Sequence, residues 1–172
     1  MIVKSIDVKL IEFTTNFISE NWKKINKDPV CFGLRDDSYG SFTITESGLI
    51  NTFKLVHRSG SLKCRNKASA SYWGCAQVKN KLITVITFKN GTALSLAEYG
   101  RYVYGCNYYS YHINGVDVDS PELAFNILPS PVPVSVGQEF QIWTARDLID
   151  CGEDRYNSEP GRTCADVYAW YA

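Results

Sequence analysis

The chain has no excess of charge of either sign and no long basic or apolar run. Its 172 residues carry 18 lysines and arginines against 18 aspartates and glutamates, so the formal net charge is zero. No more than two basic residues follow one another, which argues against a general nucleic-acid binder and against a patch for anionic membranes. No apolar run approaches the roughly 20 residues of a membrane span, so membrane insertion is not expected.

Histidine is scarce, and the motifs of common enzymes are missing. Two histidines and no Cys-x-x-Cys pair argue against a zinc site. The chain has no Gly-x-Ser-x-Gly, no phosphate-binding loop and no Gly-x-Gly-x-x-Gly. His57 is expected in a strand, and two lone histidines do not support a Ser-His-Asp triad. The sequence therefore does not predict an enzyme.

The first residues do not form a signal peptide, because Met1 is followed by Ile-Val-Lys-Ser. Other features point to secretion. The six cysteines are even in number and favour disulfides in an oxidising compartment, and Asn90-Gly91-Thr92 is a glycosylation sequon. We expect a secreted protein, and this chain would then be its mature form with a start methionine added for expression.

The length fits one domain with its own core, spanning residues 1–172. Alternation over Ile6–Leu10 predicts a short strand. From Thr15 the apolar period changes to that of a helix, with Ile18, Trp22 and Ile25 on one stripe, ended by Pro29. An N-terminal strand and helix over about 5–27 are therefore expected before a β-rich body over 31–172.

The body reads as strands separated by long loops. Asn90-Gly91 after the β-branched run Leu82–Phe88 predicts a hairpin turn, and Pro133 gives Val132–Val136 the character of an edge strand. Further strands are expected at Phe42–Thr45, Ile50–Val56, Gln138–Trp143 and Ala165–Tyr171. The sequence predicts an α+β class that is β-rich, with one or two helices and long loops that carry function.

The most polar stretch is the acidic loop, residues 147–166. No aliphatic side chain follows Ile149 until Ala165, and a polar loop of this length is usually functional or disordered. Carboxylates and an amide are the hard oxygen donors that calcium prefers. The candidate metal ligands are Asp147, Glu153, Asp154, Asn157, Glu159 and Asp166. The alternative is a solvated surface loop in which Asp147 pairs with Arg146 or Arg155.

A tyrosine cluster runs from Tyr99 to His112. Tyr beside Gly, Ser and Asn is the composition of a recognition surface, and aromatic faces suit the apolar face of a pyranose. Tyr156 and the Tyr104–Tyr111 segment are the candidate stacking residues for such a sugar. The alternative is a set of alternating strand residues, half of them in the core.

Several segments, in order and spacing from about residue 31 to the end, resemble a group of secreted sea-anemone and coral proteins. The characterised type of this group is the sea-anemone calcium-dependent galactose-binding lectin. The segments are Cys31-Phe-Gly-Leu-Arg-Asp-Asp-Ser-Tyr-Gly40, Phe53-Lys-Leu-Val-His-Arg-Ser-Gly60, Tyr72-Trp-Gly-Cys75, Ile142-Trp143, Asp147-Leu148 and Gly161-Arg-Thr-Cys-Ala-Asp-Val-Tyr168.

This resemblance implies a disulfide-stabilised, C-type-lectin-like fold in which a loop-held calcium coordinates sugar hydroxyls directly. Two positions depart from the group: Arg146 stands where a Glu is usual, and Cys151 is extra in a longer loop. The sugar-binding residues that it implies are Glu153, Asp154, Arg155, Tyr156, Asn157 and Glu159, and the metal ligands are the six candidates above.

The cysteines allow fifteen pairings. Cys64 and Cys75, separated by a short loop, are a plausible local pair. Cys31 with Cys164 would join the ends of the β region, as the resemblance implies. Cys106 and Cys151 remain, and they either tie the tyrosine cluster to the acidic loop or include a bridge between protomers, giving a disulfide-linked homodimer.

The function predicted is a calcium-dependent lectin for terminal galactosides. The alternative is a secreted matrix or adhesion module of the same fold without a sugar site, for which Arg146 speaks because a cation near the loop opposes calcium. A secreted enzyme or toxin-like effector is the third hypothesis.

Overall fold

The computed structural model describes residues 22–64, 69–94, 102–103, 106–107, 110–149 and 161–172, with the backbone alone at 102–103 and 106–107. Strands are the main regular secondary structure in this part of the chain. The elements are β1 (Trp22–Lys24), β2 (Val30–Gly33), β3 (Gly40–Thr43), β4 (Gly48–Gly60), β5 (Thr84–Phe88), β6 (Tyr102–Val103), β7 (Cys106–Asn107), β8 (Glu122–Ala124), β9 (Val132–Val134), β10 (Glu139–Thr144), α1 (Ala145–Leu148) and β11 (Arg162–Tyr171).

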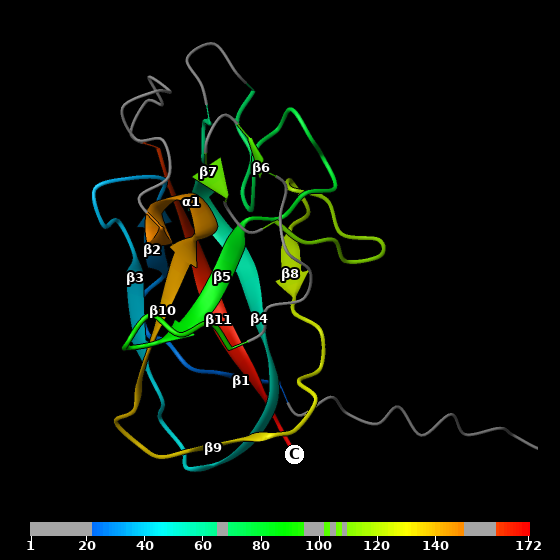
Figure 1. The fold of residues 1–172 in the computed structure, drawn as a ribbon. Coiled ribbons are helices and arrows are strands. Elements are labelled where there is room, and N and C mark those ends of the chain that lie inside the picture. Colours follow the sequence, from blue (N-terminus) through cyan, green and yellow to red (C-terminus); the bar gives the residue numbers. More distant parts are fainter. Residues whose placement is uncertain (1–21, 65–68, 95–101, 104–105, 108–109, 150–160) are drawn as a thin grey trace, which may run out of the picture.

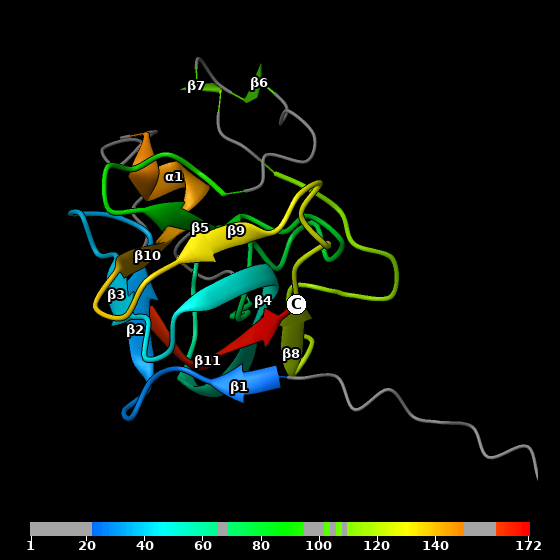
Figure 2. The same cartoon turned by 90° about the horizontal axis from the view of Figure 1, so that it is seen from below.

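The larger sheet has six strands built around β11, and every pair in it is antiparallel. β11 pairs with β4 along one side and with β1 and β2 along the other, and β4 also pairs with β8 and β9. Figure 2 shows β1 on the outer side of β11. Because side chains alternate along a strand, Ala165, Val167 and Ala169 enter the core, while Asp166 and Tyr168 lie on the opposite face.

The smaller sheet has the order β3-β10-β5 and lies in front of β4 and β11 in Figure 1. Aromatic rings fill the space between the two sheets. The ring of Phe140 on β10 lies 5.8 Å from Phe42 on β3 and 5.5 Å from Phe53 on β4. All three are buried, so this cluster holds the two layers together through apolar contact.

The predicted strands of the body are confirmed with small shifts at their ends. The Asn90-Gly91 turn is also confirmed, because Gly91 adopts φ +81° and the Phe88 amide donates to Thr92 O at 2.8 Å. β9 is an edge strand that contains Pro133, as expected. The β-rich character follows from these β-branched and aromatic runs.

The predicted helix is wrong at its C-terminal end. Trp22–Lys24 form β1, with Trp22 opposite Trp170 and Lys24 opposite Tyr168 on β11. The Ile25 amide continues the pattern by donating to Val167 O at 2.8 Å. Backbone pairing with a long central strand outweighs a weak local helical preference. The rest of that helix and the strand at Ile6–Leu10 lie outside the described residues.

Two disulfides cross-link the described part of the chain. Cys31 on β2 is bonded to Cys164 on β11, its partner in the strand register, and Cys64 is bonded to Cys75. Both of these expected pairs are confirmed. The side chains of Cys106 and Cys151 lie outside the described residues, so their pairing stays a prediction. Of the helices described, none is long and apolar enough to cross a membrane.

Candidate functional site

Helix α1 sets the start of the acidic loop. The sequence turns from β10 into α1 at Thr144, whose hydroxyl caps the helix by accepting from the Asp147 amide at 3.4 Å. A threonine at this position satisfies an otherwise unpaired helical N–H. The hydroxyl also donates to Gly33 O at 3.0 Å, which ties α1 to the end of β2. Thr144, at the start of α1, therefore lies beside the end of β2, and α1 is seen in the upper half of Figure 1.

The two stems of the acidic loop lie beside the β2–β3 loop, residues 34–39, and beside Gly33, the last residue of β2. On the outgoing stem (147–149), Asp147 Oδ1 accepts from the Asp37 amide at 3.2 Å. On the returning stem (161–162), Gly161 O lies 3.3 Å from the position that a Cβ would take at Gly33. Gly33 is also the register partner of Arg162. The outgoing stem therefore lies beside the β2–β3 loop, and the returning stem lies beside the end of β2 directly before that loop.

The returning stem is closely packed. A Cβ at Gly161 would lie 2.5 Å from the carbonyl oxygen of Ser61, so this approach requires glycine. The Arg162 guanidinium donates to Cys31 O at 2.9 Å, beside the Cys31–Cys164 disulfide. These contacts fix the point at which β11 begins.

The β2–β3 loop has an unusual backbone. Asp36 and Asp37 both adopt left-handed φ angles, 60° and 53°, which are uncommon for residues other than glycine and are tolerated best by Asp and Asn. The Gly33 amide donates to Ser38 O at 2.7 Å and closes the turn, while Arg35 forms an ion pair with Asp36 at 3.3 Å. Strained backbone of this kind gathers at functional sites.

The same loop presents an aromatic ring. Tyr39 is 38% exposed and stacks on Trp143 of β10, with ring centroids 4.5 Å apart and an interplanar angle of 27°. Trp143 is buried, and its indole N–H donates to Gln141 Oε1 at 3.0 Å. Sequence reasoning did not single out Tyr39, although Asp-Asp-Ser before it is a turn signal.

Most predicted site residues lie outside the described part of the chain: Glu153, Asp154, Arg155, Tyr156, Asn157 and Glu159. The two that the structure places are Asp147 and Asp166. Asp147 is buried at the outgoing stem and contacts the β2–β3 loop. Asp166 lies on β11, and the structure brings it together with cations rather than with other carboxylates.

The Asp166 carboxylate is buried among three donors. Arg58 Nε and Nη2 each lie 2.6 Å from Oδ2, Lys24 Nζ lies 3.0 Å from the same oxygen, and the Asn26 amide donates to Oδ1 at 3.1 Å. Burial alone would raise the pKa of Asp166, but the hydrogen bonds from Lys24, Arg58 and Asn26 outweigh it and lower the pKa.

Of these two carboxylates, only Asp147 is suited to binding calcium. An oxygen of Asp147 at the outgoing stem has the right chemistry for a hard cation. Asp166 fits poorly, because its carboxylate already forms ion pairs with Arg58 and Lys24. Among the described residues, no group of three or more His, Cys, Asp or Glu side chains is arranged to hold a metal ion.

Arg146 departs from the pattern of the group that the chain resembles. It is buried on α1, and its Nη1 donates to the carbonyl of Cys64 at 3.4 Å. Cys64 is half of the second disulfide. The guanidinium therefore connects α1 with the Cys64–Cys75 segment.

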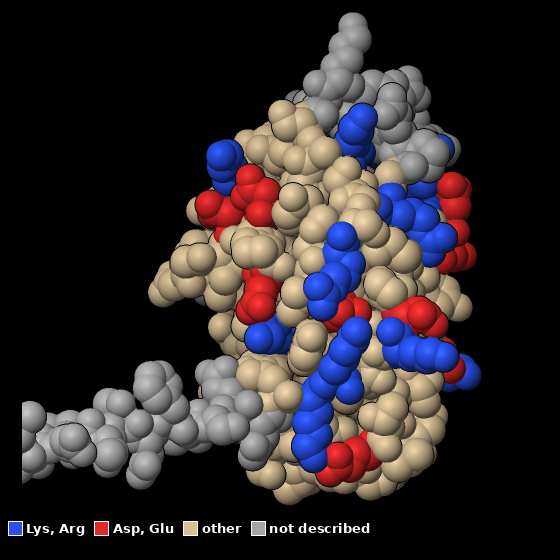
Figure 3. Space-filling model, turned by 180° about the vertical axis from the view of Figure 1, so that it is seen from behind, with Lys and Arg blue, Asp and Glu red and all other residues tan. Residues whose placement is uncertain are grey.

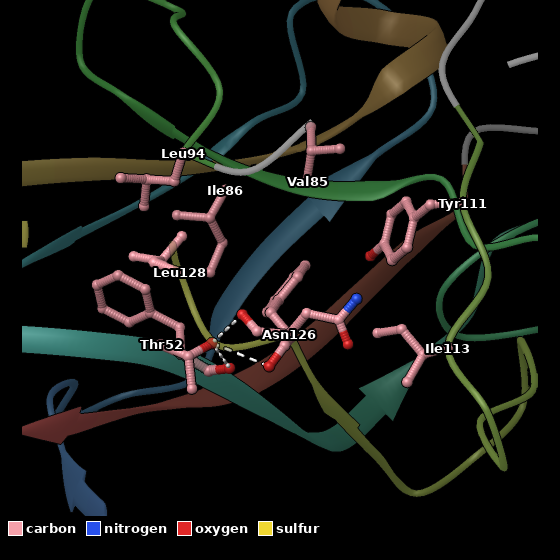
Figure 4. Close-up of a pocket in the computed structure, with 10 residues that line it drawn as sticks. Thr52, Val85, Ile86, Leu94, Tyr111, Ile113, Asn126 and Leu128 are labelled. Atoms are coloured by element: carbon pink, nitrogen blue, oxygen red, sulfur yellow. Dashed lines mark hydrogen bonds between the residues drawn. The ribbon is translucent and has the colours of Figure 1, made fainter. Parts of the chain in front are cut away.

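A pocket lies between β4, β5 and the segments around Tyr111 and Phe125 (Figure 4). Its walls are mainly apolar, and Phe53, Ile86 and Leu128 are among the residues that line it. The Tyr111 hydroxyl donates to Thr84 O at 2.5 Å beside it, and burial raises the pKa of this phenol. For Tyr111, the core interpretation of the tyrosine cluster is confirmed.

Comparison with solved structures shows what the whole arrangement is similar to. The lectin AJLec from the sea anemone Anthopleura japonica matches with a TM-score of 0.77 and 26% sequence identity, over 88% of this chain and 97% of that chain. No protein-family model matches the sequence, and the comparison with curated proteins finds no match. The chain resembles the sea-anemone lectin group, and this likeness supports a lectin-like function.

Proposed function

We propose that the protein is a secreted calcium-dependent lectin with a C-type-lectin-like fold that binds terminal galactosides through the acidic loop. The observation that carries this proposal is the similarity to a sea-anemone lectin over most of both chains. The two stems of the acidic loop add support, because the outgoing stem is hydrogen-bonded to the β2–β3 loop and the returning stem is paired with the end of β2. Binding residues on loops that a scaffold holds are the usual arrangement.

The proposed calcium ligands are Glu153, Asp154, Asn157 and Glu159, with Asp147 at the outgoing stem. The ion would offer open coordination positions to vicinal sugar hydroxyls. The same carboxylates would accept hydrogen bonds from those hydroxyls, and Arg155 and Tyr156 would contact the sugar. We leave Asp166 out of this ligand set, because Arg58 and Lys24 compete for its oxygens.

Extracellular localisation agrees with the two disulfides and with the lectin neighbour. A single site of this kind binds weakly, so avidity would come from a homodimer. Cys106 or Cys151 would supply the covalent bridge in that dimer, if the two do not pair within one chain.

An adhesion or matrix module of the same fold is the second candidate. The observation that favours it is Arg146, a cation one residue from the proposed ligand Asp147. A cation near the calcium ligands would disfavour the bound ion. This module would fold and persist without responding to calcium.

The test is binding to a glycan array in calcium and again in EDTA. We expect galactoside signals that disappear with chelator, and their loss in Asp154→Ala and in Glu159→Ala. Asp119→Ala is the matched control, because Asp119 is an exposed carboxylate outside the acidic loop. Thermal unfolding supplies a second readout, since a ligand that binds the folded state raises the melting temperature.

Three other results would contradict the proposal. Signals that survive chelation would move the sugar site away from calcium. A folded protein with no glycan signal and no calcium-dependent stabilisation would favour the adhesion module. Equal losses in Asp119→Ala and Asp154→Ala would show that the effect is not specific to the acidic loop.

A further inference from the structure

A hairpin turn outside the proposed sugar site carries a modification motif. Asn90-Gly91-Thr92 is the only Asn-x-Ser/Thr tripeptide in the 172 residues. It forms the green turn at the end of β5 in Figure 1, and both Asn90 and Thr92 are exposed. A tripeptide of this kind receives a glycan where its side chains are accessible at the surface of a secreted protein.

Hydrogen bonds fix the backbone on both sides of this tripeptide. The Phe88 amide donates to Thr92 O at 2.8 Å, and the Gly91 amide donates to Phe88 O at 2.9 Å. Gly91 adopts φ +81°, a left-handed angle that glycine takes without strain. Because these bonds join residues 88–92 only, the turn can form before the two sheets pack against each other.

The same turn orients the Asn90 side chain. Its Oδ1 accepts from the Thr92 amide at 3.0 Å, which is the arrangement of an Asx-turn. An amide N–H contacts an acceptor, so this end of the carboxamide is the oxygen and Nδ2 is the other end. Among the residues that the structure describes, none accepts a hydrogen bond from Nδ2. The nitrogen that carries a glycan in such a motif is therefore available.

We propose that Asn90 is an N-glycosylation site and that its glycan stands at the hairpin end of the smaller sheet. The inference rests on the secretion that the proposed function includes. In the reaction, Nδ2 attacks the anomeric carbon of an oligosaccharide that a lipid diphosphate carries, under catalysis by a transferase of the secretory pathway. The C–N bond forms and the bond from the anomeric carbon to the diphosphate oxygen breaks. The lipid diphosphate leaves, and Nδ2 loses one proton.

The position of the glycan limits which surfaces can contact another copy of the chain. The arm after the turn covers the outer edge of β5, where the Leu94 amide donates to Ile86 O at 3.0 Å. A Cβ at Gly91 would lie 3.9 Å from Leu148 Cδ1, so the turn also adjoins α1. A glycan is bulky and hydrated, and this end of the hairpin must then stay in solvent. The proposed homodimer uses another face of the molecule.

The experiment expresses the full chain behind a cleavable secretory leader in insect cells and maps the glycopeptides of the secreted protein by mass spectrometry. The peptide that contains Asn90 should carry a glycan in the wild type and in Thr92→Ser. The glycan should be absent in Asn90→Gln and in Thr92→Ala, although the second variant keeps the asparagine. Asn114→Gln is the matched control and should keep the glycan. Asn114 is the other exposed asparagine before a glycine, but Val116 follows where the motif needs a hydroxyl.

Two further measurements sharpen the assignment. Enzymatic release of the glycan in heavy-oxygen water should convert Asn90 into a labelled aspartate. Spontaneous deamidation of the Asn-Gly pair before the digest leaves an unlabelled aspartate, so the label reports glycosylation alone. Light scattering should give the same oligomeric state for the wild type and for Asn90→Gln, because the glycan lies outside the contact between copies.

The outcomes distinguish this inference from the proposed function. A secreted wild type without a glycan on Asn90 would overturn the site and leave the lectin. A glycan that persists in Asn90→Gln and Thr92→Ala would belong to another residue and also overturn the site. A monomeric wild type beside a dimeric Asn90→Gln would overturn the placement of the glycan outside the contact. A protein that is glycosylated at Asn90 but binds no galactoside in calcium would support this inference and overturn the lectin.

Discussion

Asp166 Oδ2 lies 2.6 Å from Nε of Arg58, across the paired strands β4 and β11. Lys24 of β1 reaches the same oxygen at 3.0 Å, and the Asn26 side chain binds the other oxygen. One buried carboxylate thus links three strands of the larger sheet on the face opposite the core. Seen from behind (Figure 3), basic and acidic side chains are interspersed over the molecule.

Stability should fall in acid because of Asp166. Its pKa lies below the ordinary value of 3.8, so its contribution to the free energy of unfolding is present above about pH 4 and is lost as the pH falls through the folded-state pKa. Asp166→Asn should cost about 1–2 kcal/mol at pH 7, because its cationic partners are partly exposed. Urea unfolding of both proteins from pH 7 to pH 2.5 measures this, and the difference should shrink in acid.

Asp119→Asn is the control for this series, since Asp119 is an exposed carboxylate with no ion pair among the described residues. Its stability difference from the wild type should be small at every pH. A constant difference between Asp166→Asn and the wild type down to pH 2.5 would refute the assignment. Calcium-dependent stabilisation that persists in Asp166→Asn would support leaving this residue out of the ligand set.

Gly161→Ala should destabilise the protein by about 1–3 kcal/mol, as overpacking does. The added methyl would lie 2.5 Å from the Ser61 carbonyl oxygen, and backbone on both sides has little room to shift. Denaturant midpoints of the variant and the wild type give the cost. If the protein is a lectin, calcium affinity should fall as well, because the returning stem would move. Equal midpoints would show that this contact is looser than described.

Tyr111→Phe should lower stability by about 1 kcal/mol, the usual net value of a hydrogen bond. Its hydroxyl donates to Thr84 O at 2.5 Å beside the apolar pocket. Thermal unfolding measures the loss, and glycan binding should not change. A loss of binding without a loss of stability would instead place Tyr111 in the recognition surface.

Removing the Cys31–Cys164 bond should destabilise the protein more than removing Cys64–Cys75. The first closes a loop with a sequence separation of 133 and the second one of 11, and longer loops gain more from a crosslink in the chain-entropy account. We expect losses of about 4 and 2 kcal/mol for the paired Cys→Ala variants, measured by urea unfolding. The reverse order would indicate residual structure in the unfolded chain.

The sequence predicts the elements that neighbouring residues specify, and the disulfide between cysteines that are close in the sequence. The run Leu82–Phe88 with its Asn90-Gly91 turn needs only neighbouring residues to specify a strand and a hairpin, and the structure confirms both. The pair Cys64–Cys75 follows from short separation. The pair Cys31–Cys164 followed from the resemblance, and its cause is the register of β2 against β11.

Residues whose roles depend on distant partners were not predicted. Trp22–Lys24 follow a helical apolar pattern, but they form a strand because the backbone of β11 is available to pair with them. The acidic neighbours of Asp166 in sequence suggested calcium, whereas Arg58 and Lys24 from other strands surround it in space. Tyr39 is oriented by stacking on Trp143, which lies more than a hundred residues away in the sequence. The residues around Tyr39 therefore do not predict this contact.

The two stems beside the β2–β3 loop have a consequence for variation and engineering. Because contacts fix both stems of the acidic loop near the end of β2, we expect that residues can be added to or removed from this loop without shifting the register of β11. The entropic cost of a longer loop grows only slowly, by about 0.6 kcal/mol for each doubling of its length. A scaffold of this kind accepts different sugar-binding loops between the same two stems, while the two sheets stay unchanged.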